Sequence, residues 1–238
     1  GTSTTYPDYD TFFDTYCLTL PPLVLDDSNS AAIAITQYQI EGSFPVGADV
    51  SVTGDSFTIT YGTNSISYDP THAADTALLT INGMIKIEGD LVIGEKSLDV
   101  LYDGRGTIYA AGGTDTSVEA GEAGAIGDID VHSNLIPVGI FPTQDVLGVV
   151  AKRDIYLADG PGDSQLYMAA AFYGGREIKS TKQNQIAGTF VCDVFDMGTN
   201  VPKIYQVPEL INNLPPGLIG AEDIWITTGF KERSWRVD

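Results

Sequence analysis

The sequence predicts an all-β protein in which residues 77–238 form a β-solenoid, similar to a parallel β-helix. Three observations support this fold class. Helical periodicity is nearly absent, short β-type runs recur about every twenty residues, and a hydrophobic content of 43% supplies a core. Residues 1–76 are predicted to form an acidic, strand-rich N-terminal region, and residues from about 198 onward a Pro-rich C-terminal cap.

The N-terminal region is predicted to begin with one helix and to continue with strands. Apolar residues between Asp8 and Leu20 fall at i, i+3, i+4, i+7 and i+8, which is the spacing of one helix face. The pair Pro21–Pro22 would end this helix. Alternating apolar and polar residues then predict strands over 32–40, 49–53 and 56–61.

A unit of about twenty residues recurs beyond residue 77. Each unit is a short β-type run that follows a glycine or a charged residue, and the third residues of these runs are Leu91, Ile108, Ile129, Ile155, Ile178 and Ile224. Their spacings are 17, 21, 26, 23 and 46, the last being twice 23. Such repeats are typical of solenoids, in which each coil stacks on its neighbours and buries aliphatic side chains. The apolar runs 146–151 and 166–173 fit strands buried on both faces.

An irregular antiparallel sandwich is the structural alternative, because hairpins also give short strands at regular spacing. Two-residue hairpins favour Asn-Gly or Asp-Gly, and such pairs are few here; Asn82-Gly83 and Asp103-Gly104 are the exceptions. The pattern therefore favours the solenoid.

Two segments do not fit regular strands. Residues 111–126 are small, acidic and Gly-rich, which predicts an exposed excursion from a coil. Residues 198–220 contain four prolines, so they cannot form a regular central strand. We expect this Pro-rich stretch, together with Trp225 and Trp235, to cap the solenoid and protect its flank.

The charge balance limits the classes of partner that the chain can bind. It has 32 acidic and 12 basic residues, a formal net charge of −20, and no Lys or Arg before Lys86. Nucleic-acid binding is therefore disfavoured, because it depends on Lys and Arg that release counterions from phosphates. No apolar stretch approaches the ~18 residues of a membrane span. The composition favours an extracellular, secreted protein. Cations, neutral glycans and basic proteins are compatible partners, but the acidity is explained more simply as a means of keeping a secreted protein soluble.

Cys17 and Cys192 are the two cysteines of the sequence. Their separation excludes a local metal-ligand cluster. A disulfide between them, which a secreted protein permits, and two buried thiols are both compatible with the sequence.

Several segments of the C-terminal half have a distinctive amino-acid sequence: residues 102–109 (YDGRGTIY), 147–157 (LGVVAKRDIYL), 170–191, 196–210 and 213–220 (NLPPGLIG). Over roughly residues 80–238 the chain resembles PilX-type minor pilins, which are proteins associated with bacterial type IV pili. In related proteins a β-solenoid forms the exposed globular part. The long apolar N-terminal helix of such proteins has no counterpart in this sequence. The resemblance implies a role in a surface fibre rather than an enzymatic one.

Paired carboxylates are the first candidate site. Asp128 and Asp130 alternate in a predicted strand, so both side chains should point to one face, which His132 would share. With Asp103 they are candidate calcium ligands, because hard cations prefer oxygen ligands. The Asp128–Asp130 pair could also supply the acid and base of a β-helix glycosidase. A solvated acidic face explains the same residues, and no EF-hand loop is present.

Basic and aromatic residues give the remaining candidates. A basic stripe along adjacent coils would support an enzyme acting on polysaccharides, whereas ion pairs with Asp154 and Glu177 are the structural explanation. The stripe comprises Lys152, Arg153, Arg176, Lys179 and Lys182. Exposed tyrosines would support glycan stacking, with Tyr102, Tyr109, Tyr156 and Tyr167 as candidates.

Taken together, the sequence predicts a non-enzymatic extracellular module of a cell-surface fibre of the type IV minor-pilin class. Its role would be assembly, adhesion or surface display, with other fibre subunits, a glycan, or a host or abiotic surface as partners. A polysaccharide-active β-helix enzyme is the alternative, and a DNA-uptake component is the third hypothesis. Calcium is the one cofactor that the sequence suggests.

Overall fold

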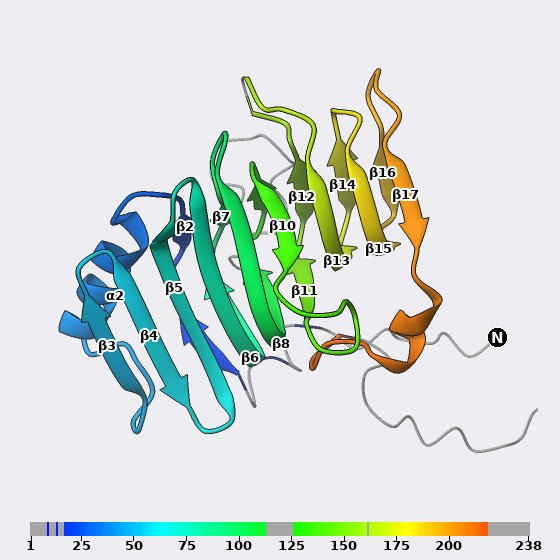
Figure 1. Ribbon diagram of the computed structural model, residues 1–238. Helices are drawn as coiled ribbons and strands as arrows, with labels where there is room; N and C mark the ends of the chain where they lie inside the picture. The colour runs from blue at the N-terminus through cyan, green and yellow to red at the C-terminus, as the bar shows by residue number, and fades with distance from the viewer. Residues whose placement is uncertain (1–8, 10–12, 14–16, 113–125, 161, 219–238) are drawn as a thin grey trace, which may run out of the picture.

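The computed structural model describes residues 9, 13, 17–112, 126–160 and 162–218, and the description below refers to these residues. They form two β-sheets that face each other, with the main hydrophobic core between them (Figure 1). The expectation of a mostly β protein is confirmed. No helix in the described part of the chain is long and apolar enough to cross a membrane.

The strands divide unequally between the two sheets. Within the described residues the large sheet has eleven strands: β1 (Leu18–Leu20), β3 (Asp49–Thr53), β4 (Ser56–Tyr61), β5 (Asn64–Ala73), β6 (Thr76–Glu88), β8 (Asp99–Ala111), β10 (Asn134–Pro137), β11 (Val146–Ala151), β13 (Tyr167–Gly174), β15 (Gln185–Val191) and β17 (Lys203–Gln206). The small sheet there has six: β2 (Leu23–Leu25), β7 (Leu91–Ile93), β9 (Ile129–Val131), β12 (Asp154–Leu157), β14 (Glu177–Ser180) and β16 (Val194–Asp196).

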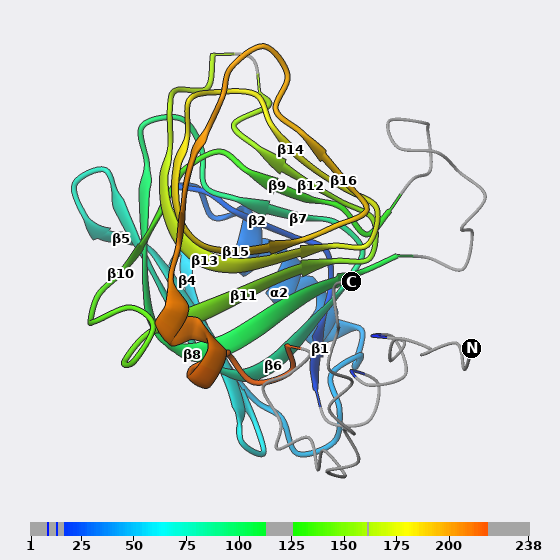
Figure 2. The same cartoon turned by 90° about the vertical axis from the view of Figure 1, so that its right-hand side faces the viewer.

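From β6 onward the chain passes back and forth between the two sheets, with β10 and β11 as two consecutive strands of the large sheet. The small sheet has the order β2-β7-β9-β12-β14-β16, and all its pairs are parallel. In the large sheet, β6, β8, β11, β13, β15 and β17 also pair in parallel. We call a large-sheet strand and the small-sheet strand that follows it a rung. Figure 2, viewed along the stack, shows successive rungs superimposed.

Stacking places equivalent aliphatic side chains in line. Ile129, Ile155 and Ile178 are direct neighbours across β9, β12 and β14, and all three are fully buried. Burying one such side chain is worth about 1.5–3 kcal/mol. The repeat read from the sequence therefore describes the small sheet. Ile108 does not belong to it, because it lies in β8 of the large sheet, and Ile224 lies outside the described residues.

The N-terminal residues contribute to both sheets. β1 and β2 pair in parallel with β6 and β7, whereas β3, β4, β5 and β6 form an antiparallel meander. The strands predicted over 49–53 and 56–61 are confirmed as β3 and β4. One core cluster runs from Leu18 to Ile186 through both predicted regions. The division of the chain at residue 76 stays a prediction.

The strand predicted over 32–40 is wrong, because these residues belong to helix α2 (Ser30–Ile40). Ala31, Ala32 and Ile35 are buried, and the helix contacts β2, β3 and β4, so it covers the first end of the stack. Ile33 is 59% exposed. The apparent alternation came from alanines, which fit a strand pattern but are the best helix formers.

The helix predicted over 8–20 is wrong at its C-terminal end. Tyr9 and Phe13 are helical, but Leu18 and Leu20 lie in β1, where pairing with β6 places them fully buried in the main core. The other residues of 8–16 lie outside the described residues.

The Pro-rich stretch follows the last rung. β17 is an edge strand, as expected for a Pro-rich segment, and the 3-10 helix η1 (Pro208–Asn212) comes after it. Leu214 and Leu218 then pack on the outer face of the large sheet. The segments 113–125 and 219–238, with Trp225 and Trp235, lie outside the described residues.

A second, smaller cluster covers part of that outer face. It consists of Tyr9, Phe13, Cys17, Met84, Tyr109, Ala111, Val150, Ala171 and Leu218, and we call it the outer cluster. It explains why every residue of β11 is buried, since the main core lies on the other face of that strand. The structure contains no Cys17–Cys192 disulfide, because Cys17 lies in the outer cluster and Cys192 packs against the main core.

Candidate functional site on the small sheet

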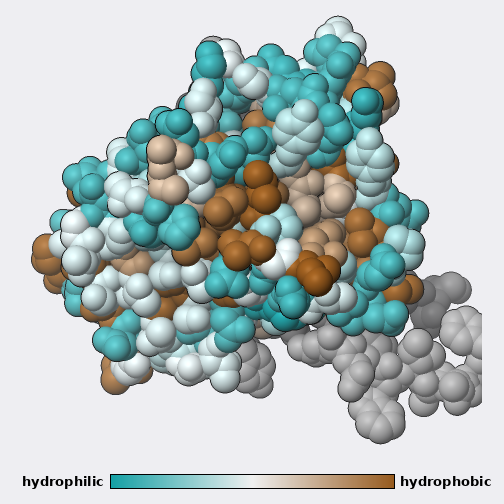
Figure 3. Space-filling view, viewed as in Figure 1, coloured by the Kyte–Doolittle hydropathy of each residue, from teal (hydrophilic) through white to brown (hydrophobic). Residues whose placement is uncertain are grey.

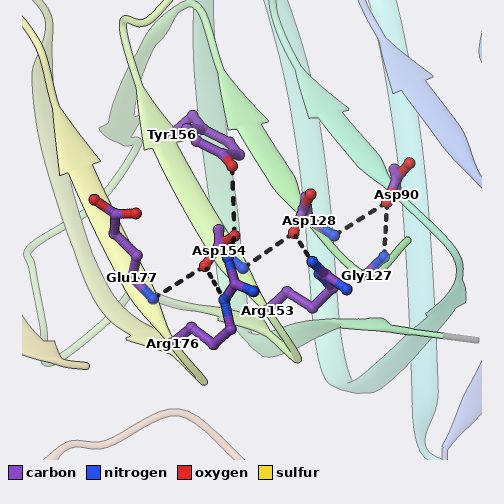
Figure 4. A network of polar contacts seen from close by, with 8 residues as sticks. All are labelled: Asp90, Gly127, Asp128, Arg153, Asp154, Tyr156, Arg176 and Glu177. Atoms are coloured by element: carbon purple, nitrogen blue, oxygen red, sulfur yellow. Dashed lines mark hydrogen bonds and ion pairs between the residues drawn. The ribbon is translucent and has the colours of Figure 1, made fainter. Parts of the chain in front are cut away.

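Four carboxylates occupy equivalent positions at the start of successive small-sheet strands. Asp90 precedes β7, Asp128 precedes β9, and Asp154 and Glu177 begin β12 and β14. They lie in a row across the sheet (Figure 4). We call this row the acid ladder.

Each of the first three acids accepts hydrogen bonds from the backbone of the next rung. Asp90 Oδ1 lies 2.7 Å from the amide nitrogen of Gly127 and 3.1 Å from that of Asp128. Asp128 Oδ1 accepts from Asp154 N–H at 3.1 Å, and Asp154 Oδ1 accepts from Glu177 N–H at 3.1 Å. These bonds satisfy backbone donors that lie where the chain enters each strand. The acid ladder therefore has a structural role in joining rungs.

Arginines neutralise part of this charge. Arg176 binds Asp154 through two hydrogen bonds, with Nη2–Oδ2 at 3.1 Å and Nε–Oδ1 at 3.3 Å. Arg153 is 7% exposed and has its Nε 3.7 Å from Asp128 Oδ1, but its Nε and Nη2 have no hydrogen-bond partner among the described residues. Of the basic stripe, Arg176 thus pairs with Asp154, as its structural explanation expected, whereas Arg153 faces Asp128 and Lys179 pairs with Asp159.

The environment of the ladder shifts the proton affinity of Asp128. Burial, helped by the nearby charges of Asp154 and Asp90, raises the pKa of Asp128 to about 6. The hydrogen bond from Asp154 N–H and the charge of Arg153 oppose this shift. Burial also raises the pKa of Asp130. Both carboxyls therefore hold a proton more readily than an exposed aspartate does.

A shallow hollow of about 540 Å³ lies on the outer face of the small sheet. Asp128 and Asp130 both line it, so they share a face as the alternation predicts. Its lining is mostly acidic and comprises Asp128, Asp130, Tyr156, Asp159, Glu177, Lys179 and Asp196. Lys179 Nζ lies 2.9 Å from Asp159 Oδ2 and neutralises part of the negative charge of the hollow.

The expected trio of calcium ligands is not one site. Asp103 lies on β8 of the large sheet, whereas Asp128 and Asp130 lie on the small sheet. Among the described residues, no three His, Cys, Asp or Glu side chains form a group that could hold a metal ion. Calcium binding by Asp128 and Asp130 stays a prediction.

His132 is held by a neighbouring turn. Its Nδ1 lies 2.7 Å from Asp163 Oδ2, and the same oxygen accepts the Gly160 N–H at 2.7 Å. This contact ties the loop after β12 to the end of β9. This pair has no local signature in the sequence, because Asp163 is 31 residues from His132.

The candidate tyrosines divide by burial. Tyr102 and Tyr109 are buried, whereas Tyr167 is 52% exposed. Tyr167 and Tyr205 border an apolar hollow of about 260 Å³ on the outer face of the large sheet, with Ala169 and Ala187 in its lining. Apolar side chains gather on this face of the molecule (Figure 3).

The acids of the ladder recur in the sequence, but the sequence does not show that they join the rungs. The acid stands directly before Leu91, Ile129, Ile155 and Ile178, so it recurs with the repeat. Because an acid before an apolar residue is common in so acidic a chain, only the register of the sheet shows that these acids contact one another.

Comparisons with known proteins give a likeness of fold. No protein-family model and no curated protein matches the chain. Among solved structures, the crystal structure of the competence-associated pilin ComZ from Thermus thermophilus is similar, with a TM-score of 0.57 and 20% sequence identity. The match covers 90% of this chain and 42% of the ComZ chain, so this chain spans less than half the length of that protein.

Proposed function

We propose that the chain is an extracellular, non-enzymatic module of a cell-surface fibre, of the type IV minor-pilin class to which PilX-type proteins belong. In this proposal residues 77–238 form a β-solenoid that is displayed on the fibre. The module acts in assembly of the fibre, in adhesion or in surface display. Its partners are other fibre subunits.

The observation that carries this proposal is the likeness of fold to a pilin over nine tenths of the chain. ComZ is described as a competence-associated pilin. The segments of the C-terminal half that resemble minor pilins point to the same class independently of the fold.

The chemistry of the small sheet supports a scaffold. Three acid-ladder carboxylates accept hydrogen bonds from backbone N–H groups, and both nearby arginines face these carboxylates. Side chains that hold the backbone together are poor candidates for a reaction that needs them to exchange protons with a substrate.

Deletion of the gene in its host tests the proposal. We expect a loss of piliation, surface adhesion or natural transformation, restored by the gene in trans. Immunogold labelling of sheared fibres should place the protein on the fibre. Unchanged piliation, adhesion and transformation, with no label on fibres, would contradict it. A defect confined to transformation would favour the DNA-uptake hypothesis, which a gel shift with double-stranded DNA at low salt then tests.

A second candidate, hydrolysis of a polysaccharide, is favoured by one observation. The hollow on the small sheet combines Asp128, whose pKa is raised to about 6, with a second carboxyl, Asp130. A raised pKa suits a general acid in glycoside hydrolysis. Release of reducing sugar from neutral or acidic glycans, abolished by Asp130→Asn, would establish this activity. A screen without turnover, with and without calcium, would reject it.

A further inference from the structure

The apolar hollow on the outer face of the large sheet has a floor of small side chains. Ala169 of β13, Ala187 of β15 and Tyr205 of β17 are in register. All three lie on the outer face, because side chains alternate along a strand and the preceding residues Met168 and Ile186 are buried in the main core. The two alanines leave space above the sheet, and this space is the hollow.

Two tyrosines border this floor. Tyr167 and Tyr205 are 52% and 53% exposed. They are two strands apart and two residues out of register, so their α-carbons lie about 12 Å from each other. Tyrosine rings in such positions offer an apolar face for stacking and a hydroxyl group for hydrogen bonds. The hollow therefore combines aromatic platforms with a floor that a ring-shaped ligand can approach.

The backbone under these rings is held in place by hydrogen bonds. The Tyr167 N–H donates to Asn134 Oδ1 at 2.7 Å, and Asn134 Nδ2 donates to Asp99 Oδ1 at 2.6 Å. From the core side, Tyr102 Oη donates to the carbonyl oxygen of Ala169 at 2.6 Å. A surface that is ordered before the ligand arrives loses less conformational entropy on binding.

The charge of the hollow differs from that of the rest of the chain. None of the described residues that line it is charged, although the chain has a net charge of −20. Lys203 aligns with the lining residue Gln185 but is not part of the lining. The net charge repels an acidic ligand, and a basic one is attracted to the acidic hollow on the small sheet instead. An uncharged ligand fits the apolar hollow best.

We propose that the apolar hollow binds a neutral glycan, with sugar rings stacked on Tyr167 and Tyr205. The side-chain amide of Gln185 can both donate and accept hydrogen bonds, which suits sugar hydroxyl groups. The volume of about 260 Å³ lies below the roughly 300–1,000 Å³ of pockets for drug-sized ligands, so the hollow holds a short part of a longer glycan. This inference is independent of the fibre proposal, because binding is measured on the isolated chain.

An oligosaccharide array tests the proposal. The 238-residue chain is applied to glucan, galactan, mannan and N-acetylglucosamine oligomers, with galacturonate oligomers as the acidic comparison. We expect binding to at least one neutral series, and calorimetry then gives its affinity. A chain that binds none of the neutral oligomers at millimolar concentration would overturn the proposal. Galacturonate bound as tightly as the neutral oligomers would also overturn it.

Variants place the binding in the hollow. Tyr167→Ala and Tyr205→Ala should each weaken it about tenfold, because each removes a stacking platform. Tyr205→Phe should bind nearly as well as wild type, since it keeps the ring. Ala187→Leu keeps both tyrosines but fills the floor, so it should also weaken binding. Ile40→Ala, which removes a 74% exposed side chain on α2, is the control and should leave the affinity unchanged.

Thermal unfolding of each variant shows whether the chain stays folded. Folded Tyr167→Ala and Tyr205→Ala chains that bind the glycan as tightly as wild type would show that the hollow is not the site. Loss of binding in Ile40→Ala as well would lead to the same conclusion.

Discussion

Asp154 is the residue on which the polar contacts of the acid ladder converge. Its fully buried side chain accepts hydrogen bonds from the Glu177 N–H and from Arg176, and Tyr156 Oη lies 3.4 Å from its Oδ2. Burying a carboxylate is costly unless hydrogen bonds and an opposite charge compensate it. Here both are present, and they link two consecutive rungs.

Removing this carboxylate should weaken the fold. Asp154→Ala leaves the Glu177 N–H without its partner and Arg176 without its counter-ion, so we expect a loss of about 2–3 kcal/mol in the free energy of unfolding. Urea denaturation measures it. Asp159→Ala is the matched control: it removes an ion pair with Lys179 in which both side chains are about one-third exposed, and should cost less than about 1 kcal/mol. Equal losses in the two variants would contradict the role of the ladder.

Asp128 should make stability depend on pH. Its pKa is about 6 in the folded chain and near 3.8 when unfolded, so the folded state binds the proton more tightly. The stabilisation by this proton is full below pH 4 and is lost as the pH rises through 6. Asp128→Asn keeps an oxygen acceptor for the Asp154 N–H and removes the titration.

The two proteins should therefore differ in their pH profiles. Between pH 7 and pH 5 we expect wild type to gain about 1 kcal/mol more than Asp128→Asn, allowing for partial solvent screening. Urea denaturation at several pH values measures the difference. Parallel profiles would show that Asp128 has an ordinary pKa.

The sequence predicted the residues of this site better than their contacts. That Asp128 and Asp130 share a face follows from the two-residue period of a strand. That Asp103 is remote from them does not, because membership of one sheet or the other depends on where each loop turns. The pairing of His132 with Asp163 depends likewise on the path of a loop.

At the scale of elements, α2 is where local pattern and structure disagree. Ile33 and Ile35 are two residues apart, so a strand would place them on one face. The helix separates them: Ile35 is fully buried and Ile33 is 59% exposed. Ala, Ile and Thr alternate here in a way that fits both structures, and packing against β2, β3 and β4 decides between them.

Alanine substitution distinguishes the two structures. Ile35→Ala should cost about 2–4 kcal/mol because it leaves a cavity against the sheets. Ile33→Ala should cost less than about 0.5 kcal/mol because the side chain is largely in water. Both are measured by chemical denaturation. Similar losses at the two positions would indicate a strand with both side chains on one face.

For β11, in contrast, the sequence pattern alone predicted the burial correctly. Its continuous apolar run predicted burial on both faces, and all its residues are buried. What the sequence did not show is the source of the second cover. Tyr9, Phe13 and Leu218 reach the outer cluster from opposite ends of the chain, and such long-range packing has no local signature.

For the whole molecule, the parallel stack accommodates an acidic surface around one core. Stacked rungs pair every internal strand, so charged side chains are free to point outward from both sheets. The net charge of −20 favours solubility and disfavours contact with phosphates. A scaffold of this kind suits display on a fibre.

The fold and the fibre proposal both depend on successive rungs lying side by side in parallel register. Val92, Tyr156, Lys179 and Asp196 occupy one register line across β7, β12, β14 and β16, with Asp130 of β9 between the first two. In a chain whose native cysteines are replaced by serine, spin labels can be placed in pairs at Val92 and each of the other three positions. Their separations follow from electron paramagnetic resonance.

Because neighbouring strands lie about 4.8 Å apart, the backbone separations should be about 10, 14 and 19 Å, rising by one strand spacing per rung. A steady rise in this order is the result that the stack predicts. Separations that do not increase from Tyr156 to Lys179 to Asp196 would contradict the parallel arrangement and, with it, the likeness on which the fibre proposal rests.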